Sequence, residues 1–131
     1  MAAALKYGMS KAKILIVDDN QNISSLLKLM LTRSGYDVRT EHRSFASLAT
    51  AREFKPDIAL LDVDMPGMDG GAVAAEFAAD REFAQMPVIF VTSLIGRNEA
   101  GMRGTARFVS KPVDMNTLLA TMKEVLPRLA A

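Results

Sequence analysis

The sequence contains no cysteine among its 131 residues. This absence excludes a disulfide framework, a thiolate metal site and a cysteine nucleophile, and it is typical of proteins in a reducing compartment. The chain also lacks any apolar run close to the roughly 20 residues that a membrane-spanning helix requires. Its first segment, MAAALKYGMSK, has no continuous apolar core of the kind found in secretory signals. We therefore expect a cytoplasmic protein that does not contact a membrane.

An excess of charge of one sign is missing as well. The chain has 16 basic and 15 acidic residues, so its composition does not favour a nucleic-acid partner. Hydrophobic residues make up 50% of the chain, which argues against disorder, and no repeat or long linker divides it. We expect one domain over residues 11–127, with an N-terminal tail over residues 1–10 and a C-terminal tail over residues 128–131.

Segments with strand character alternate with segments of helical periodicity. The expected strands are residues 11–17, 36–41, 57–61, 87–91 and 107–110. The expected helices are residues 22–35, 44–54 and 70–80, and a last one that begins near Asp114. Three glycines between residues 92 and 107 disfavour a helix there, so we expect the fourth helix to be short or irregular. The alternation predicts an α/β fold with a five-stranded, doubly wound parallel sheet in the order 2-1-3-4-5.

Local patterns refine the expected helices. In the first helix, apolar residues recur at helical spacing and predict one buried face, formed by Ile23, Leu26, Leu27, Met30 and Leu31. Asn20 or Asn22 can cap the start of this helix, and Ser44 can cap the second helix. His42, the only histidine in the sequence, is expected to be exposed to solvent and to have no role.

Polar residues stand where the expected strands end. Asp18 and Asp19 follow the first strand, Asp62 follows the third, Thr92 follows the fourth, and Lys111 comes shortly after the fifth. Because the carboxyl ends of parallel strands share one edge of a sheet, these groups should lie together. Mg²⁺, which prefers oxygen ligands, would relieve the repulsion between the carboxylates. The set resembles a phosphate site in which an aspartate is the nucleophile and forms an acyl phosphate, while the hydroxyl and the ammonium bind phosphoryl oxygens.

The chain changes direction directly after this aspartate. Pro66 and Gly67 predict a sharp turn behind the third strand. As the chain turns, the backbone carbonyl of Asp64 can reach the same metal ion.

Four motifs, ILIVDD, LLDVDMPGMDG, VIFVTS and FVSKP, occur in this order, each at a strand end. Together they resemble the receiver domain of two-component response regulators, the family that includes the CheY-like single-domain chemotaxis regulators. The resemblance covers about residues 11–127 and implies a flavodoxin-like fold. It also implies a phosphoprotein of two-component or phosphorelay signal transduction. Such a protein is not an enzyme beyond weak self-phosphorylation from small phosphodonors and autodephosphorylation.

The resemblance implies roles for individual residues. Asp62 would accept a phosphoryl group from a sensor histidine kinase or a histidine phosphotransfer protein, and phosphorylation would change the surface that binds a downstream protein target. Mg²⁺ would be held by Asp18, Asp19, Asp62 and the Asp64 backbone carbonyl. The family also implies either a monomer or a phosphorylation-dependent dimer.

The remaining motif residues match the family's phosphoryl-binding and switch positions. Thr92 and Lys111 would bind the phosphoryl group, and the Lys111–Pro112 peptide bond would be cis. Thr92 would move toward the phosphate, and the ring of Phe108 would turn inward to fill the vacated space. One departure concerns the output surface, because Thr92 and Lys111 are 19 positions apart, fewer than in a typical receiver, and the shortened segment is rich in glycine.

Two alternatives to a phosphorylated receiver stay open on the sequence. A pseudo-receiver would bind partners without phosphorylation, and the shortened fourth-helix segment allows it, although the full acidic site argues against it. A phosphatase of the haloacid-dehalogenase type would use the D-x-D form of Asp62-Val63-Asp64, but Met65-Pro66 does not fit that motif. A dinucleotide-binding domain is excluded, because no G-x-G-x-x-G follows the first strand.

Overall fold

One mixed sheet forms the centre of the molecule. The computed structural model describes residues 11–65, 67–93, 101–103 and 106–126. Six strands pair in the order β2-β1-β3-β4-β6-β5. Their bounds are β1 Lys13–Val17, β2 Asp37–Glu41, β3 Ile58–Asp62, β4 Val88–Thr92, β5 Gly101–Arg103 and β6 Ala106–Ser110. All neighbours from β2 to β6 are parallel, and β5 is antiparallel to β6. The predicted parallel order is confirmed, with one short strand added at the β6 edge.

The added strand comes from the glycine-rich segment. β5 pairs with β6 in a part of the chain for which the sequence predicted a short or irregular fourth helix. Each glycine in a helix interior costs about 1 kcal/mol relative to alanine, which weakens the helical alternative for this segment. Residues 94–100 and 104–105, where the other turns of that helix were predicted, lie outside the described residues.

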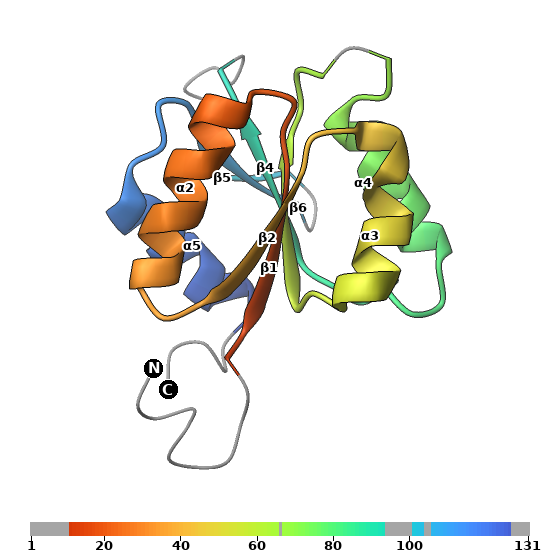
Figure 1. Ribbon diagram of the computed structural model, residues 1–131, viewed down its shortest axis with the longest axis horizontal. Coiled ribbons are helices and arrows are strands. Elements are labelled where there is room, and N and C mark those ends of the chain that lie inside the picture. Colours follow the sequence, from red (N-terminus) through yellow and green to blue (C-terminus); the bar gives the residue numbers. More distant parts are fainter. Residues whose placement is uncertain (1–10, 66, 94–100, 104–105, 127–131) are drawn as a thin grey trace.

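Helices cover both faces of the sheet (Figure 1). They are α2 Gln21–Arg33, α3 Ser47–Phe54, α4 Gly70–Ala79 and α5 Met115–Val125, with a 3₁₀ turn, η1 Ser44–Ala46, before α3. Figure 1 shows α2 and α5 on one face and α3 and α4 on the other. Asn20 caps α2 by accepting a hydrogen bond from the Ile23 amide, and Asp114 caps α5 in the same way through the Thr117 amide. None of the helices in the described part of the chain combines the length and the apolar character needed to span a bilayer.

The core has two halves because side chains alternate along each strand. In β1, Ile14 and Ile16 face α2 and α5, whereas Leu15 and Val17 face α3 and α4. The first half includes Leu27, Leu31, Ile58, Leu60, Ile89, Val91, Leu118 and Met122. The second half includes Ala51, Ala59, Leu61, Met65, Val73, Phe77 and Phe83. The central strands are therefore buried on both faces, as their continuous apolar runs predict.

Two details of the predicted helices are wrong. Ser44 does not cap α3, because it lies inside η1, and its carbonyl accepts a hydrogen bond of 2.7 Å from the Ser47 hydroxyl. In α2, the predicted apolar face is only partly buried: Leu27 and Leu31 lie in the core, while Leu26 keeps 59% of its surface exposed. The exposed part of this face borders a groove that α2 forms with the loop after β6. The predicted tails, residues 1–10 and 128–131, lie outside the described residues.

Candidate functional site

Three carboxylates meet at the carboxyl edge of two neighbouring strands. Asp18 and Asp19 follow β1, and Asp62 is the last residue of β3, which pairs directly with β1. One oxygen from each of the three side chains lies within 4.8 Å of the other two. Asp18 and Asp62 are only 5% and 3% exposed, whereas Asp19 is open to solvent. The sequence therefore correctly predicted that these three residues lie together.

Backbone contacts from β2 and α2 fix the position of Asp18. Its amide donates to the Glu41 carbonyl (3.1 Å), and its Oδ1 accepts from the Asn20 amide (2.9 Å). Burial, together with the nearby charge of Asp62, raises the pKa of the Asp18 carboxyl to about 6, although the Asn20 hydrogen bond and the charge of Lys111 oppose this rise. Negative charge on Asp18 is therefore unfavourable in this site, and a bound cation would stabilise the ionised carboxylate.

His42 contradicts its predicted exposure. The residue is half-buried, and its ring Nδ1 lies 3.0 Å from the Asp18 carbonyl oxygen. In the tautomer with a proton on Nδ1, the ring donates a hydrogen bond to this carbonyl. The position directly after β2, at the same edge of the sheet as the acidic residues, was the available signal for this contact.

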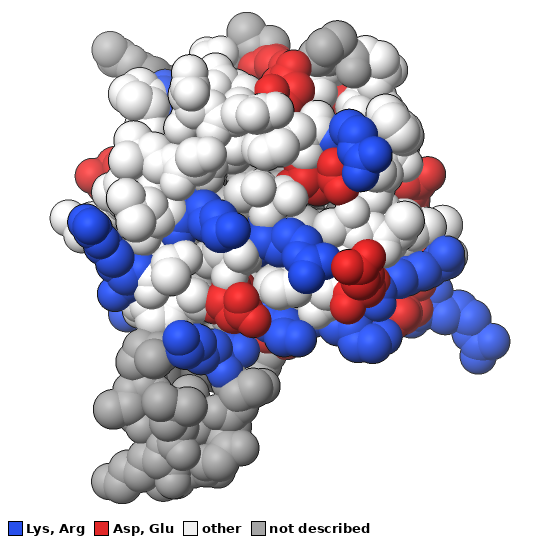
Figure 2. All heavy atoms as spheres, in the orientation of Figure 1, with Lys and Arg blue, Asp and Glu red and all other residues white. Residues whose placement is uncertain are grey.

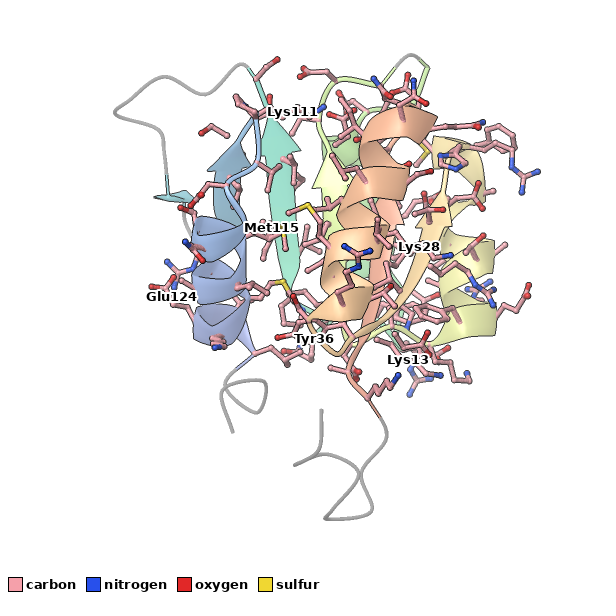
Figure 3. The ribbon with its side chains drawn as sticks, turned by 60° about the vertical axis from the view of Figure 1, so that its left-hand side comes forward. Lys13, Lys28, Tyr36, Lys111, Met115 and Glu124 are labelled. Carbon is pink, nitrogen blue, oxygen red and sulfur yellow. The ribbon has the colours of Figure 1, made fainter. Side chains whose placement is uncertain are left out.

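Lys111 supplies a positive charge directly beside Asp62. Its Nζ lies 3.0 Å from Asp62 Oδ1, and its side chain is 19% exposed. Burial lowers the pKa of Lys111, but the hydrogen bond to Asp62 and the charges of Asp18, Asp62 and Asp64 outweigh this effect and raise the pKa overall. The Lys111–Pro112 peptide bond is cis, the conformation that the resemblance implied. Figure 3 shows Lys111 at the upper end of the sheet, between the elements that carry the acidic residues and α5.

Asp64 contacts the site through two groups. Its backbone amide donates to Asp62 Oδ1 (3.1 Å), and its side-chain Oδ2 accepts from the Thr92 hydroxyl (3.2 Å). Thr92 is the last residue of β4 and is buried, and its carbonyl accepts from the Lys111 amide (3.0 Å). The sequence predicted a role for the Asp64 carbonyl alone, because nothing in the spacing of the motifs indicates where its carboxylate points.

Phe108 lies next to this site but lower on the sheet. It is paired in register with Phe90, whereas Thr92 is paired with Ser110. The rings of Phe108 and Phe90 stack with centroids 5.1 Å apart and an interplanar angle of 26°. The half-buried Phe108 is thus held by an aromatic neighbour on β4.

Gly70 supports the site in a way that the sequence analysis missed. It is the first residue of α4, and a Cβ atom built on it would lie 2.5 Å from the backbone oxygen of Asp62. The start of α4 therefore packs directly on the end of β3, at a distance that only glycine permits. From the sequence, Gly67 was expected in a turn, which its positive φ of 83° supports, and Gly70 was expected in the helix over residues 70–80, with no close approach to the strand foreseen.

The surface around the carboxyl edge is uneven in charge and polarity. Figure 2 shows Lys and Arg side chains across the middle and lower part of one face, with a mostly uncharged area over α2 at the upper left. Four apolar residues of α2 are exposed, namely Ile23, Leu26, Leu29 and Met30. A groove of about 220 Å³ runs between α2 and the loop after β6, lined by Ile23, Leu26, Leu27, Met30, Lys111, Pro112, Val113 and Met115. Its lining includes Lys111, whose ammonium is paired with Asp62, so the groove lies beside the acidic site.

The donor set fits a hard divalent cation. All candidate ligands are carboxylate or carbonyl oxygens, which suit Mg²⁺ better than softer metals. Burial and, to a smaller extent, the charge of Asp62 make the ionised form of Asp18 unfavourable, and the Lys111 ammonium offsets this only in part. A bound dication would stabilise the ionised carboxylates, so the residues present are compatible with a magnesium site.

Comparisons with known proteins agree with this arrangement. The profile of the response regulator receiver domain matches residues 14–123. The protein PilH of Pseudomonas aeruginosa is 38% identical over 118 residues, which cover 88% of this chain and 98% of PilH. The response regulator PleD of Caulobacter vibrioides is also 38% identical, over 87% of this chain but only 26% of PleD. The solved structure of the chemotaxis protein CheY4 of Vibrio cholerae superposes with a TM-score of 0.79 at 28% identity, covering 89% of this chain and all (100%) of CheY4.

Proposed function

This chain belongs to the receiver domains of two-component response regulators, and from that premise we propose that it is a phosphorylation-dependent switch in which Asp62 accepts the phosphoryl group. One observation carries the proposal: the buried Asp62 carboxylate lies between two further carboxylates and the Lys111 ammonium, at the end of the central strand β3. A carboxylate in this position has both a cation partner and an open acidic neighbour, Asp19, on the solvent side.

The chemistry requires little from the protein beyond positioning and charge neutralisation. An oxygen of Asp62 attacks phosphorus, and a new O–P bond forms while the P–N bond of a phosphohistidine donor breaks. The electron pair of the broken bond leaves with the imidazole nitrogen of the donor. Lys111 neutralises the charge on one phosphoryl oxygen, and the hydroxyl of Thr92 donates a hydrogen bond to another.

We propose that Asp18, Asp19, Asp62 and the Asp64 carbonyl hold Mg²⁺ during this reaction. When bound, the ion supplies charge neutralisation between the carboxylates and the incoming phosphoryl oxygens. After transfer, movement of Thr92 toward the phosphoryl group is the proposed start of the switch, and Phe108 is the proposed responding residue. The movement of Phe108 changes the surface to which a downstream protein binds.

The proposal is tested by phosphorylation from a small donor. Purified protein is incubated with Mg²⁺ and acetyl phosphate, and its intact mass is measured. We expect one acid-labile phosphoryl group, no incorporation in the presence of EDTA, and no incorporation in Asp62→Asn. Reduction of the acyl phosphate with borohydride, followed by peptide mapping, locates the modified residue. An unmodified parent protein would support a pseudo-receiver, and steady turnover of phosphomonoesters would support a phosphatase.

The phosphodonor is proposed to be a histidine kinase or phosphotransfer protein that places an apolar helix in the groove along α2. A donor histidine must come within bonding distance of Asp62, so its protein has to cover the residues that border Asp62. One of these residues, Lys111, lines the groove together with Leu26 and Met30, which are exposed on α2. An amphipathic helix with apolar residues at i, i+3 and i+4 matches such a lining.

Leu26→Glu is expected to slow phosphorylation by a phosphohistidine protein that phosphorylates the parent chain, by about tenfold or more, because a charge replaces apolar contact area. Its phosphorylation by acetyl phosphate should be unchanged, since that donor needs no docking surface. Leu29→Glu is the matched control: Leu29 is exposed on the same helix but does not line the groove. Equal effects of both variants on the protein donor would contradict docking in this groove.

A further inference from the structure

We infer that the carboxylate of Asp64 holds Thr92 in its unphosphorylated arrangement and competes with the incoming phosphoryl group for the Thr92 hydroxyl. The inference rests on the proposed phosphorylation of Asp62 and adds to it a residue that limits the reaction. It concerns the side chain of Asp64, whereas the proposed metal site uses only its backbone carbonyl.

The competition follows from the hydrogen bond between the two side chains. The Thr92 hydroxyl donates to Asp64 Oδ2 at 3.2 Å. A hydroxyl carries a single proton, so it cannot donate to the carboxylate and to a phosphoryl oxygen at the same time. Thr92 is 3% exposed, and a neighbouring acceptor therefore determines the direction of this proton more strongly than water does. Phosphorylation has to break the existing contact before Thr92 can bond to the phosphoryl group.

The backbone around the pair places the two groups without depending on this contact. The Asp64 amide is bonded to Asp62 Oδ1, and the Thr92 carbonyl is bonded to the Lys111 amide. Asp64 itself is exposed, so its carboxylate can swing into solvent by side-chain rotation alone. The contact is therefore a reversible latch, which can open while the strand ends and the Asp62–Lys111 pair stay in place.

The negative charge of Asp64 disfavours phosphorylation of Asp62, as its hydrogen bond with Thr92 does. A phosphoryl group on Asp62 brings additional negative charge to a place that already holds the carboxylates of Asp18, Asp19 and Asp62. Asp64 adds a further carboxylate, which lies against the Thr92 hydroxyl on a residue whose amide is bonded to Asp62 Oδ1. An alanine at position 64 removes both the acceptor and the charge, while an asparagine removes the charge and keeps an oxygen acceptor for the hydroxyl.

The first experiment measures the initial rate of phosphorylation by acetyl phosphate at a fixed, non-saturating concentration with Mg²⁺. We expect Asp64→Ala to react about tenfold faster than the parent, which is the effect of a charged hydrogen bond of modest strength. Asp64→Asn should lie between the two. Glu124→Gln makes the same change in net charge at the far end of α5 (Figure 3) and should leave the rate unchanged.

A double-mutant cycle separates the hydrogen bond from the charge. In a Thr92→Val background, the hydroxyl is absent, so Asp64→Ala should no longer accelerate phosphorylation through Thr92, and most of its gain should disappear. If Asp64→Ala accelerates both backgrounds by the same factor, Asp64 acts only through its charge, and the competition for Thr92 is wrong.

A second measurement tests the latch without phosphorylation or metal. In the metal-free, unphosphorylated protein, Asp64→Ala should shift the NMR resonances of the Thr92 methyl group, and Glu124→Gln should not. Unchanged Thr92 resonances together with an unchanged phosphorylation rate would overturn this inference while leaving Asp62 as the acceptor. A parent protein that is never phosphorylated would instead overturn the proposed function, and the Thr92 resonances would still decide whether the latch exists.

Discussion

Gly70→Ala is expected to lower the free energy of unfolding by about 2–3 kcal/mol, because the new methyl group would meet backbone atoms that cannot easily move. Its Cβ would lie 2.5 Å from the Asp62 oxygen and 3.1 Å from the Asp62 carbonyl carbon. Relief requires either α4 to withdraw from the sheet or the end of β3 to shift. Gly70 is the first residue of α4, so the gain in helix propensity from alanine is too small to offset this cost.

The control for this variant is Gly71→Ala in the same helical turn. The added Cβ would lie 3.3 Å from Asp69 Oδ1, the exposed cap oxygen that accepts from the Ala72 amide, and this atom has to shift by only a few tenths of an ångström. We expect its stability to differ from the parent by less than about 1 kcal/mol. Urea unfolding of the three proteins measures the difference. Equal stabilities for the two variants would show that the approach of α4 to Asp62 does not constrain the fold.

Gly70→Ala should also impair the site in molecules that remain folded. The displaced atoms belong to Asp62 itself, so its carboxylate should lose its alignment with Lys111. In the absence of denaturant we expect slower phosphorylation by acetyl phosphate in Gly70→Ala and a rate close to that of the parent in Gly71→Ala.

The second large effect concerns pH and Asp18. In the metal-free protein, the parent should become less stable relative to Asp18→Asn by about 2–3 kcal/mol as the pH rises from about 4 to about 7. The cause is the pKa of Asp18, which burial raises from 3.8 to about 6 in the folded protein. Asparagine keeps an oxygen that can accept the hydrogen bond from the Asn20 amide, so the two proteins differ mainly in charge.

The sign follows from proton binding in the two states. Below about pH 4, the Asp18 carboxyl is protonated in both the folded and the unfolded chain and contributes nothing. Between about pH 4 and pH 6, the unfolded chain has lost this proton while the folded chain keeps it, so the folded state loses stability as the pH rises. Above about pH 6 the Asp18 carboxyl is ionised in both states, and the full loss of folding stability is present.

Denaturant unfolding in EDTA at several pH values measures this difference. Other carboxyl groups titrate in the same range, and subtracting the curve of Asp18→Asn removes their common contribution. Parallel stability curves for the two proteins would show that Asp18 ionises as easily in the folded chain as in the unfolded one, and the electrostatic account of the acidic site would be wrong.

Much of the site could be predicted because it depends on strand ends. Asp62, Thr92 and Lys111 come together once the strand order is known, since parallel strands bring their carboxyl ends to one edge. The strands themselves were recognisable from apolar runs that end abruptly in polar residues. Neither step needs information about how side chains pack.

The features that escaped prediction depend on contacts between elements that are distant in the sequence. The exposure of Leu26 and Met30 follows from how closely the loop after β6 approaches α2, which the periodicity of one helix cannot reveal. The contact of His42 with the Asp18 carbonyl and the hydrogen bond from Thr92 to Asp64 likewise require the tertiary arrangement. β5 was missed because three residues are too few to show a period.

The positions of the start of β1 and the end of α5 determine where a receiver domain can be joined to other domains. β1 begins, and α5 ends, at the edge of the sheet opposite Lys111, as the labels of Lys13, Glu124 and Lys111 show in Figure 3. A tether attached at either end would leave from the base of the fold and would not cross the acidic edge. This arrangement is compatible with a match that covers nearly the whole of one relative, PilH, and about a quarter of another, PleD.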